Sequence, residues 1–404
     1  MINSIDRFLS HSGKNVRRSA IREILKLLQR PDMISFAGGL PAPETFPVEE
    51  LRKIAYEVLE QSGPECLQYG TTEGDMYLRN VLVEKSRKSG FDIGIENLII
   101  TTGSQQTIDL IAKIFIDPGD YIMCGLPSYL GAINTFLVYG ANLKGISLDS
   151  DGMNPSELEE TLARLKGYGR RIKFIYIIPD FQNPSGITMS ESRRHRIIEI
   201  AEKYDLLLIE DSPYRDVRFE GETQRTMFEL DNTGRVISLF TFSKILAPGF
   251  RVGWVVGNPV LLDRIVMAKQ TSDLCTSPFV QRIIARYIEK GLLEKNLRKT
   301  IELYHARRDI MLEALRKNMP ESVKWTEPQG GLFLFLSLPE KFNTEMILRK
   351  SIEKNVAFVS GSTFFCNNSG RNTMRLNFSF SNKYEIEEGI RRLADVIRSE
   401  MNQH

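Results

Sequence analysis

Short, almost continuous apolar runs recur through the middle of the chain. Their β-branched and aromatic residues favour strands, and most of the runs are separated by stretches with the apolar period of a helix. The runs cover residues 98–101, 121–124, 142–148, 172–178, 206–209, 236–240 and 252–256. Strands that are apolar on both faces and alternate with helices predict an α/β fold with a mostly parallel sheet. The last run follows its neighbour after a short connection, so we expect it to be antiparallel.

A second, smaller α+β domain is predicted after this sheet. A long charged helical stretch, residues 279–318, is broken near Gly291 and leads the chain away from the sheet. Beyond it we expect strands at 330–336, 356–359 and 374–378, covered by helices at 344–354 and 384–399. The predicted division is an N-terminal arm (1–16), a helix and segment packing with the small domain (17–46), a large domain (47–290) and the small domain (291–404).

Composition narrows the function classes. The chain has 404 residues, a formal net charge of +2 and 26% charged residues, which gives no reason to expect nucleic acid or an anionic membrane as a partner. No apolar run is long enough to span a bilayer, and the first twenty residues lack the apolar core of a secretion signal. Four widely spaced cysteines predict free thiols in a reducing cytoplasm. The four histidines have no metal-ligand spacing, so we expect no metal site.

The segment TFSKILAPGFRVGW, residues 241–254, carries the strongest chemical signal. It places Ser243 and Lys244 at the end of a predicted buried strand and Arg251 at the start of the next. Ligands of open α/β sheets bind along the carboxyl edge of the strands. Lysine forms Schiff bases with pyridoxal phosphate (PLP), and arginine binds phosphate with two parallel hydrogen bonds. The alternative is a pair of cations on a surface loop.

Two further strand ends supply groups for the phosphate and the ring of such a ligand. Ser104 and Gln105 follow the strand at 98–101 and open a helix, whose N-terminus is an anion site. The alternative is that Ser104 is only a helix cap. Tyr129 follows the strand at 121–124 and would stack on a heteroaromatic ring, although a plain core or surface tyrosine fits the local sequence equally well.

The remaining strand ends offer groups for the polar atoms of the ring. Asp211 ends an apolar strand, where a carboxylate is costly unless it is paired, and a pyridinium N–H is a suitable partner. Asn183 and Tyr214 would reach the phenolate oxygen. Taken singly, Asn183 is also explained by a turn and Asp211 by a cap. Together, the residues at these strand ends supply one group for each polar feature of PLP: the phosphate, the aldehyde, the ring oxygen and the ring nitrogen.

The whole chain resembles the class I/II aminotransferases of the fold-type I PLP-dependent family, and most of all the 2-aminoadipate/aromatic amino acid subgroup. The resemblance implies a PLP-dependent aminotransferase, with a mostly parallel seven-stranded sheet in a large domain, a smaller α+β domain and a homodimer. The segments that carry it are IREILKL, SFAGGLPAPETFP, LQYGTTEG, TTGSQQ, PSYLGA, FQNPSG, EDSPYR, FSKILAPGFRVGW, PQGGLFLF and NVAFVSG.

The resemblance also implies roles for residues outside the strand ends. Tyr69 would reach the PLP phosphate of the neighbouring subunit, and Arg375 would bind the substrate α-carboxylate with Gly39 offering its backbone nearby. Arg22 would pair with a side-chain carboxylate of an acidic donor, or else be a structural residue on a solvated helix face. The implied reaction moves the amino group of an L-amino acid (2-aminoadipate, aromatic or other) to 2-oxoglutarate.

The sequence is also compatible with three alternative functions. A PLP-dependent β-lyase or decarboxylase would have the same fold and differ in its products. A non-enzymatic effector-binding domain of a transcription regulator would need a basic winged-helix domain ahead of the motif that begins at Ser35. A catalytically inactive homologue is disfavoured by the reactive residues, which are Lys244, Asp211, Arg251 and Arg375.

Overall fold

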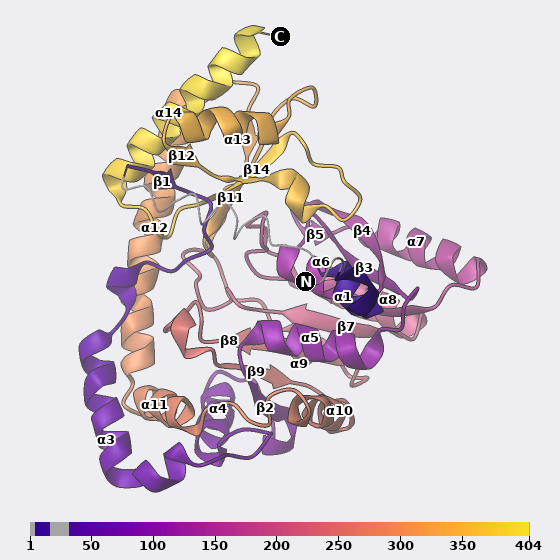
Figure 1. The fold of residues 1–404 in the computed structure, drawn as a ribbon, viewed down its shortest axis with the longest axis vertical. Coiled ribbons are helices and arrows are strands. Elements are labelled where there is room, and N and C mark those ends of the chain that lie inside the picture. The colour runs from indigo at the N-terminus through magenta and orange to yellow at the C-terminus, as the bar shows by residue number, and fades with distance from the viewer. Residues whose placement is uncertain (1–4, 17–31, 404) are drawn as a thin grey trace.

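The computed structural model describes residues 5–16 and 32–403 (Figure 1). Its main sheet has the strand order β2-β9-β8-β7-β6-β3-β4-β5. The strands are β2 (Leu98–Thr101), β3 (Tyr121–Leu126), β4 (Asn142–Asp149), β5 (Gly152–Met153), β6 (Ile172–Ile177), β7 (Leu207–Asp211), β8 (Val236–Thr241) and β9 (Gly253–Val256). All seven predicted strands are present, and β9 is antiparallel to both β2 and β8, as predicted. The two-residue strand β5 adds an eighth strand that was not predicted.

Helices cover both faces of this sheet, which explains its almost unbroken apolar strands. Phe174 and Tyr176 of β6 lie in one core, together with residues of α5 and α6, whereas Ile175 and Ile177 lie in another, with residues of α7 and α8. The helices are α4 (Met76–Lys88), α5 (Ser104–Phe115), α6 (Leu130–Val138), α7 (Pro155–Gly167), α8 (Glu191–Lys203), α9 (Met227–Leu230), α10 (Pro259–Gln270) and α11 (Pro278–Glu289). None of the helices in the described part of the chain combines the length and apolarity needed to cross a membrane.

A second, antiparallel sheet lies at the other end of the molecule, and the long helix α12 (Leu292–Asn318) connects the two regions (Figure 1). Its strand order is β10-β11-β14-β13, and β1 pairs separately with β12 in parallel. The bounds are β1 (Ile34–Ser35), β10 (Lys324–Trp325), β11 (Phe333–Ser337), β12 (Val356–Ala357), β13 (Val359–Ser360), β14 (Thr373–Asn377), α13 (Thr344–Glu353) and α14 (Lys383–Gln403). The residue limits assigned to the two domains stay a prediction.

Two predicted strands of the second sheet differ from the structure. The strand expected at 330–336 begins only at Phe333, because Gly331 has φ +72° and donates its N–H to the carbonyl of Val217 (2.8 Å). The expected strand 356–359 is two strands with different partners, since β12 pairs with β1 and β13 pairs with β14. The apolar sequence predicts that both segments are strands, but it does not show with which neighbouring strand each segment pairs.

The N-terminal part of the chain also differs in detail. Residues 5–16, expected as a loose arm, contain a 3-10 turn η1 (Asp6–Phe8) and the short helix α1 (His11–Asn15), which contacts α6. The predicted large domain begins with helix α3 (Val48–Leu67), which continues past Pro64 and has a non-helical residue at Ser62. The prediction that residues 17–31 contain a helix lies outside the described residues.

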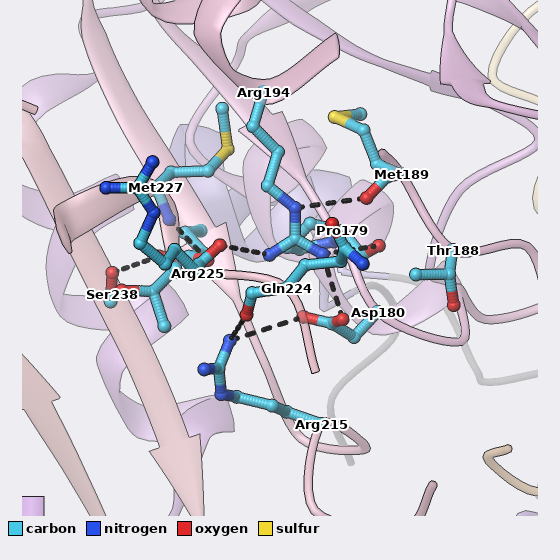
Figure 2. Close-up of polar contacts among 12 residues, drawn as sticks. Pro179, Asp180, Thr188, Met189, Arg194, Arg215, Gln224, Arg225, Met227 and Ser238 are labelled. Atoms are coloured by element: carbon cyan, nitrogen blue, oxygen red, sulfur yellow. Dashed lines mark hydrogen bonds and ion pairs between the residues drawn. The ribbon is translucent and has the colours of Figure 1, made fainter. Parts of the chain in front are cut away.

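A buried ionic cluster fixes the loop that follows β6 (Figure 2). Arg194 of α8 is fully buried and donates to the carboxylate of Asp180 (2.8 Å) and to the carbonyl of Met189 (3.1 Å) at the far end of that loop. It also donates to the carbonyl of Arg225 (2.8 Å), which ties the loop to the segment before α9. A buried charge that is satisfied by several acceptors at once holds them in one geometry. The loop so held carries Asn183.

Candidate active site

A pocket of about 260 Å³ lies at the carboxyl ends of β6, β7 and β8. It brings together every predicted site residue except Tyr69 and Arg22. The lining residues are Gly39, Ser104, Gln105, Tyr129, Ile178, Asn183, Asp211, Pro213, Tyr214, Thr241, Ser243, Lys244, Pro248, Arg251, Phe333 and Arg375. Parallel strands place their following loops along one edge, so residues far apart in sequence meet there.

One end of the pocket is suited to an anion. Helix α5 has Gly103 as its N-cap residue and no side-chain cap, so its first amide groups are free to bind a ligand. Ser104 is the first helical residue, and the alternative that it is merely the cap is therefore wrong. Gly103 has φ +79°, and a Cβ there would lie 2.7 Å from Nη2 of Arg251. The absence of a side chain lets the guanidinium lie against the helix start.

The side chains of Ser243 and Arg251 are hydrogen-bonded to each other at the anion-binding end of the pocket. Arg251 Nη1 donates to Ser243 Oγ (3.3 Å), and Thr241 Oγ1 lies 2.9 Å from the same oxygen. A serine hydroxyl, a guanidinium and open helix amides are the groups that bind phosphate in proteins. Thr241 was not among the predicted residues, although its place at the end of β8 is a signal that would have found it.

Lys244 lies between the two halves of the pocket. Its Nζ donates to the carbonyl of Gly39 (2.7 Å), a residue from the segment that follows β1. Burial, and then the positive charges of Arg375 and Arg251, together lower the pKa of Lys244 to about 8. A less basic amine has a larger neutral fraction at neutral pH, which is the form that attacks a carbonyl.

Asp211 has one oxygen bound and one oxygen free. Tyr176 donates its hydroxyl to Asp211 Oδ2 (2.6 Å), whereas Asp211 Oδ1 is buried and has no hydrogen-bond partner among the described residues. Burial raises the pKa of Asp211 to about 6, against the lowering effect of the Tyr176 hydrogen bond. A buried acceptor without a partner is costly, so its presence beside a pocket indicates that a ligand donates to it. Sequence reasoning did not find Tyr176.

Arg375 lies on β14, across the pocket from the main sheet. Its Nη1 donates to Asn183 Oδ1 (2.9 Å) and its Nη2 to the carbonyl of Ala37 (2.7 Å), while Nε is buried and finds no partner in residues 5–16 and 32–403. Phe333 and Phe364 lie 4.2 and 5.0 Å from the guanidinium, and burial lowers the pKa of Arg375 to about 10. The aromatic rings and the two acceptors hold the guanidinium in place.

The Arg375 contact also orients Asn183. Because its Oδ1 accepts from Arg375, the amide nitrogen is left to donate. A hydrogen bond from Asn183 lowers the pKa of the Tyr214 phenol, although burial is the larger effect and the pKa is raised overall. The two residues predicted to reach the same ring oxygen are therefore in contact.

Gln105 has a different arrangement from the one predicted. Tyr129 donates its hydroxyl to Gln105 Oε1 (3.1 Å), and Gln105 Nε2 donates to Thr135 Oγ1 (3.0 Å). The side chain of Gln105 thus holds the tyrosine ring, and its backbone amide is the group left for an anion.

Two predicted site residues stand apart from the pocket. Tyr69 follows α3 and is 79% exposed, and it is not among the lining residues. Arg22 lies outside the described residues. Nothing in one described chain places either residue at the site.

The residues present fit a molecule with a phosphate, an aldehyde and a ring nitrogen. Arg251 and the start of α5 suit the phosphate, the Lys244 amine suits the aldehyde, and Asp211 Oδ1 is an acceptor without a donor. These are the three recognition features of PLP. The fit rests on donor chemistry that is independent of any relative.

The family model for aminotransferase class I and II matches residues 31–393. The chain belongs to this family. It is 47% identical to "Aromatic-amino-acid aminotransferase 1" of Thermococcus litoralis over 98% of this chain and 95% of that protein. The structure of a multiple substrate aminotransferase from Thermococcus profundus superposes with a TM-score of 0.95, at 47% identity, covering 100% of both chains.

A third relative carries a bound cofactor analogue. The structure of an alpha-aminoadipate aminotransferase from Thermus thermophilus, complexed with N-(5'-phosphopyridoxyl)-L-leucine, has a TM-score of 0.91 at 35% identity and covers 99% of this chain and 100% of that one. The predicted family, fold class and aminotransferase activity are confirmed. The protein is an aminotransferase that acts on amino and oxo acids, and the family implies PLP as its cofactor.

Proposed function

We propose that this aminotransferase uses PLP to move the amino group of an L-amino acid, 2-aminoadipate or an aromatic donor among them, to 2-oxoglutarate. The observation that carries the proposal is the unpartnered, buried Asp211 Oδ1 in the same pocket as the Lys244 amine. The donor classes are those named for the relatives in Thermococcus and Thermus.

The cofactor would be held by residues from both ends of the pocket. Ser104, the Gln105 backbone, Ser243 and Arg251 would bind the phosphate, and Tyr129 would cover the ring. Asn183 and Tyr214 would donate to the ring oxygen, and Asp211 would keep the ring nitrogen protonated. When bound, PLP supplies an electron sink for the charge that develops at the substrate Cα.

Lys244 would move the proton in the chemical step. Its Nζ is the only amine that the described part of the chain contributes to the pocket lining, and its lowered pKa of about 8 makes it able to accept a proton from Cα near neutral pH. The same ammonium would then deliver the proton to C4′ of the cofactor. A positioned general base of this kind contributes about 10²–10⁴-fold in rate.

Arg375 would bind the substrate α-carboxylate. The guanidinium is already fixed by Asn183 and Ala37, so little side-chain freedom is lost on binding. Its unpartnered Nε gives it a donor to offer, and Gly39 lines the same part of the pocket. This contact selects α-amino acids over simple amines.

We also propose a homodimer in which Tyr69 reaches the phosphate of the neighbouring subunit. Tyr69 is a large aromatic residue at 79% exposure, and Leu67 beside it is 71% exposed. Exposed apolar side chains of this size are typical of a surface covered in an assembly. Arg22 would contribute the pairing group for acidic donors.

A donor panel with 2-oxoglutarate as acceptor tests the proposal. We expect glutamate to form from 2-aminoadipate, phenylalanine, tyrosine and kynurenine, with no matching release of ammonia or CO₂. Phenethylamine is the matched control, because it has the side chain of phenylalanine without the carboxylate that Arg375 would bind, and it should give no glutamate. Ammonia or CO₂ as the main product would instead indicate a β-lyase or a decarboxylase.

The same panel separates the donor classes. Arg22→Ala is expected to raise KM for 2-aminoadipate and to leave KM for phenylalanine unchanged, because only the acidic side chain needs the arginine. An equal rise in KM for both donors would contradict the proposal that Arg22 binds the side-chain carboxylate of the substrate.

A further inference from the structure

We propose that Tyr176 is a positioning residue of the cofactor site: its hydroxyl holds Asp211 Oδ2 so that the ionised Oδ1 faces the pocket. The inference rests on the proposed PLP site. It concerns a residue of the sheet interior that does not line the pocket, and it explains why one oxygen of Asp211 has a partner and the other has none.

The sheet register brings the two side chains together. Tyr176 of β6 pairs with Ile209 of β7, and Asp211 lies two residues beyond Ile209 on the same strand. Side chains two residues apart point to the same face of a strand. The resulting oxygen–oxygen distance of 2.6 Å is that of a hydroxyl donating to an ionised carboxylate.

Tyr176 has little freedom to make another hydrogen bond. Its side chain is fully buried, and its ring packs edge-on against Phe136 of α6, with ring centres 5.5 Å apart at 76°. Burial, and then the negative charge of Asp211, raise the pKa of the Tyr176 phenol well above its ordinary value. The phenol therefore keeps its proton and is the donor, and Asp211 is the acceptor.

The hydrogen bond matters because burial works against the charged form of Asp211. The pKa of Asp211 is raised to about 6, and loss of the Tyr176 donor would raise it further. At neutral pH a larger fraction of Asp211 would then be protonated and unable to accept from a pyridinium. The other titratable groups around this carboxylate are Glu210 on β7, Tyr129 before α6, Tyr214 after β7 and Lys244 after β8.

The test is the PLP affinity of the cofactor-free enzyme as a function of pH. Tyr176→Phe keeps the ring against Phe136 and removes only the hydroxyl. We expect its Kd for PLP to be about tenfold higher than that of the wild type at neutral pH, the scale of a hydrogen bond to a charged group. As the pH rises and Asp211 ionises in both proteins, the ratio should fall.

Tyr287→Phe is the matched control. It removes a phenol from the core on α11, which contributes no residue to the pocket, so its Kd should equal that of the wild type at every pH. In an Asp211→Asn background, Tyr176→Phe should lose its pH-dependent effect, because residue 211 no longer has a carboxyl group whose pKa the tyrosine hydroxyl can lower. A loss of affinity that does not vary with pH, or that is the same size with Asn at 211, would overturn the inference.

The outcomes also separate this inference from the proposed function. A wild-type enzyme that does not bind PLP would refute the proposed function. A wild type that binds PLP, with a Tyr176→Phe curve that superimposes on it, would refute only the role of Tyr176.

Discussion

Lys244→Ala is expected to lower kcat for amino-group transfer by roughly 10⁴-fold, at the upper end of what a positioned acid–base group supplies. The reason is that Lys244 is the only amine among the described residues that line the pocket, so none of these residues can take over the proton transfer. The rate is measured with excess PLP, phenylalanine and 2-oxoglutarate, so that weak cofactor binding does not account for the loss.

Lys244→Arg is the control for charge and size. It keeps a cation near the Gly39 carbonyl, but a guanidinium is not deprotonated in proteins and cannot act as the base. We expect a loss of the same order as with alanine. If Lys244→Arg retained more than a tenth of the activity, the charge of Lys244 and not its proton transfer would be its contribution.

Asp211→Asn is expected to lower kcat by about 10²–10⁴-fold, because removing one partner of a buried ion pair costs about 3–5 kcal/mol and each 1.36 kcal/mol is a factor of ten. Asparagine keeps the shape of the side chain and can still accept the Tyr176 hydroxyl at its oxygen. The folded structure should therefore be retained, and the midpoint of thermal unfolding without cofactor should not fall. Activity assays with saturating PLP and thermal unfolding measure the two quantities.

The adjacent Glu210 provides a matched control. It is equally buried but belongs to the opposite face of β7, where it accepts from the Ser238 hydroxyl and from the Met227 amide. Glu210→Gln should lower thermal stability and leave kcat within a few-fold of the wild type. A larger loss of kcat at Glu210 than at Asp211 would contradict the assignment of Asp211 to the ring nitrogen.

The sheet and its strand ends were predictable because they depend on local apolar runs. Strands β6 and β7 are buried on both faces over most of their length, so their sequences are mainly apolar and the polar residues at their ends stand out. Asp211 and Asn183 could be assigned to the pocket on this ground. Both residues lie at the same edge of the sheet because parallel strands have their carboxyl ends on one side.

The side chains behind the pocket were not predictable. Tyr176 lies within an apolar run, where the sequence predicts only that a tyrosine packs in the core. Its contact with Asp211 depends on the pairing register of β6 and β7. Phe364 flanks Arg375 from a short turn that carries no motif of its own. Both contacts are tertiary, so no local pattern records them.

Gln105 and Gly331 show a second limit of sequence reasoning. The sequence correctly placed Gln105 at the start of a helix. It did not show that the side-chain oxygen of Gln105 accepts a hydrogen bond from the Tyr129 hydroxyl, which leaves the backbone amide for an anion. The apolar stretch around Gly331 predicted a strand. In the structure, Gly331 has a positive φ and a hydrogen bond to Val217, and the strand begins two residues later, at Phe333. In each case a distant contact determines the local structure.

Borohydride reduction of the PLP-treated enzyme, followed by peptide mass mapping, shows whether Lys244 forms the covalent bond to the cofactor. We expect one pyridoxyl group per chain, attached to the peptide that contains Lys244 and absent from Lys244→Ala. A label spread over surface lysines, or no label at all, would contradict the claim that Lys244 captures the cofactor.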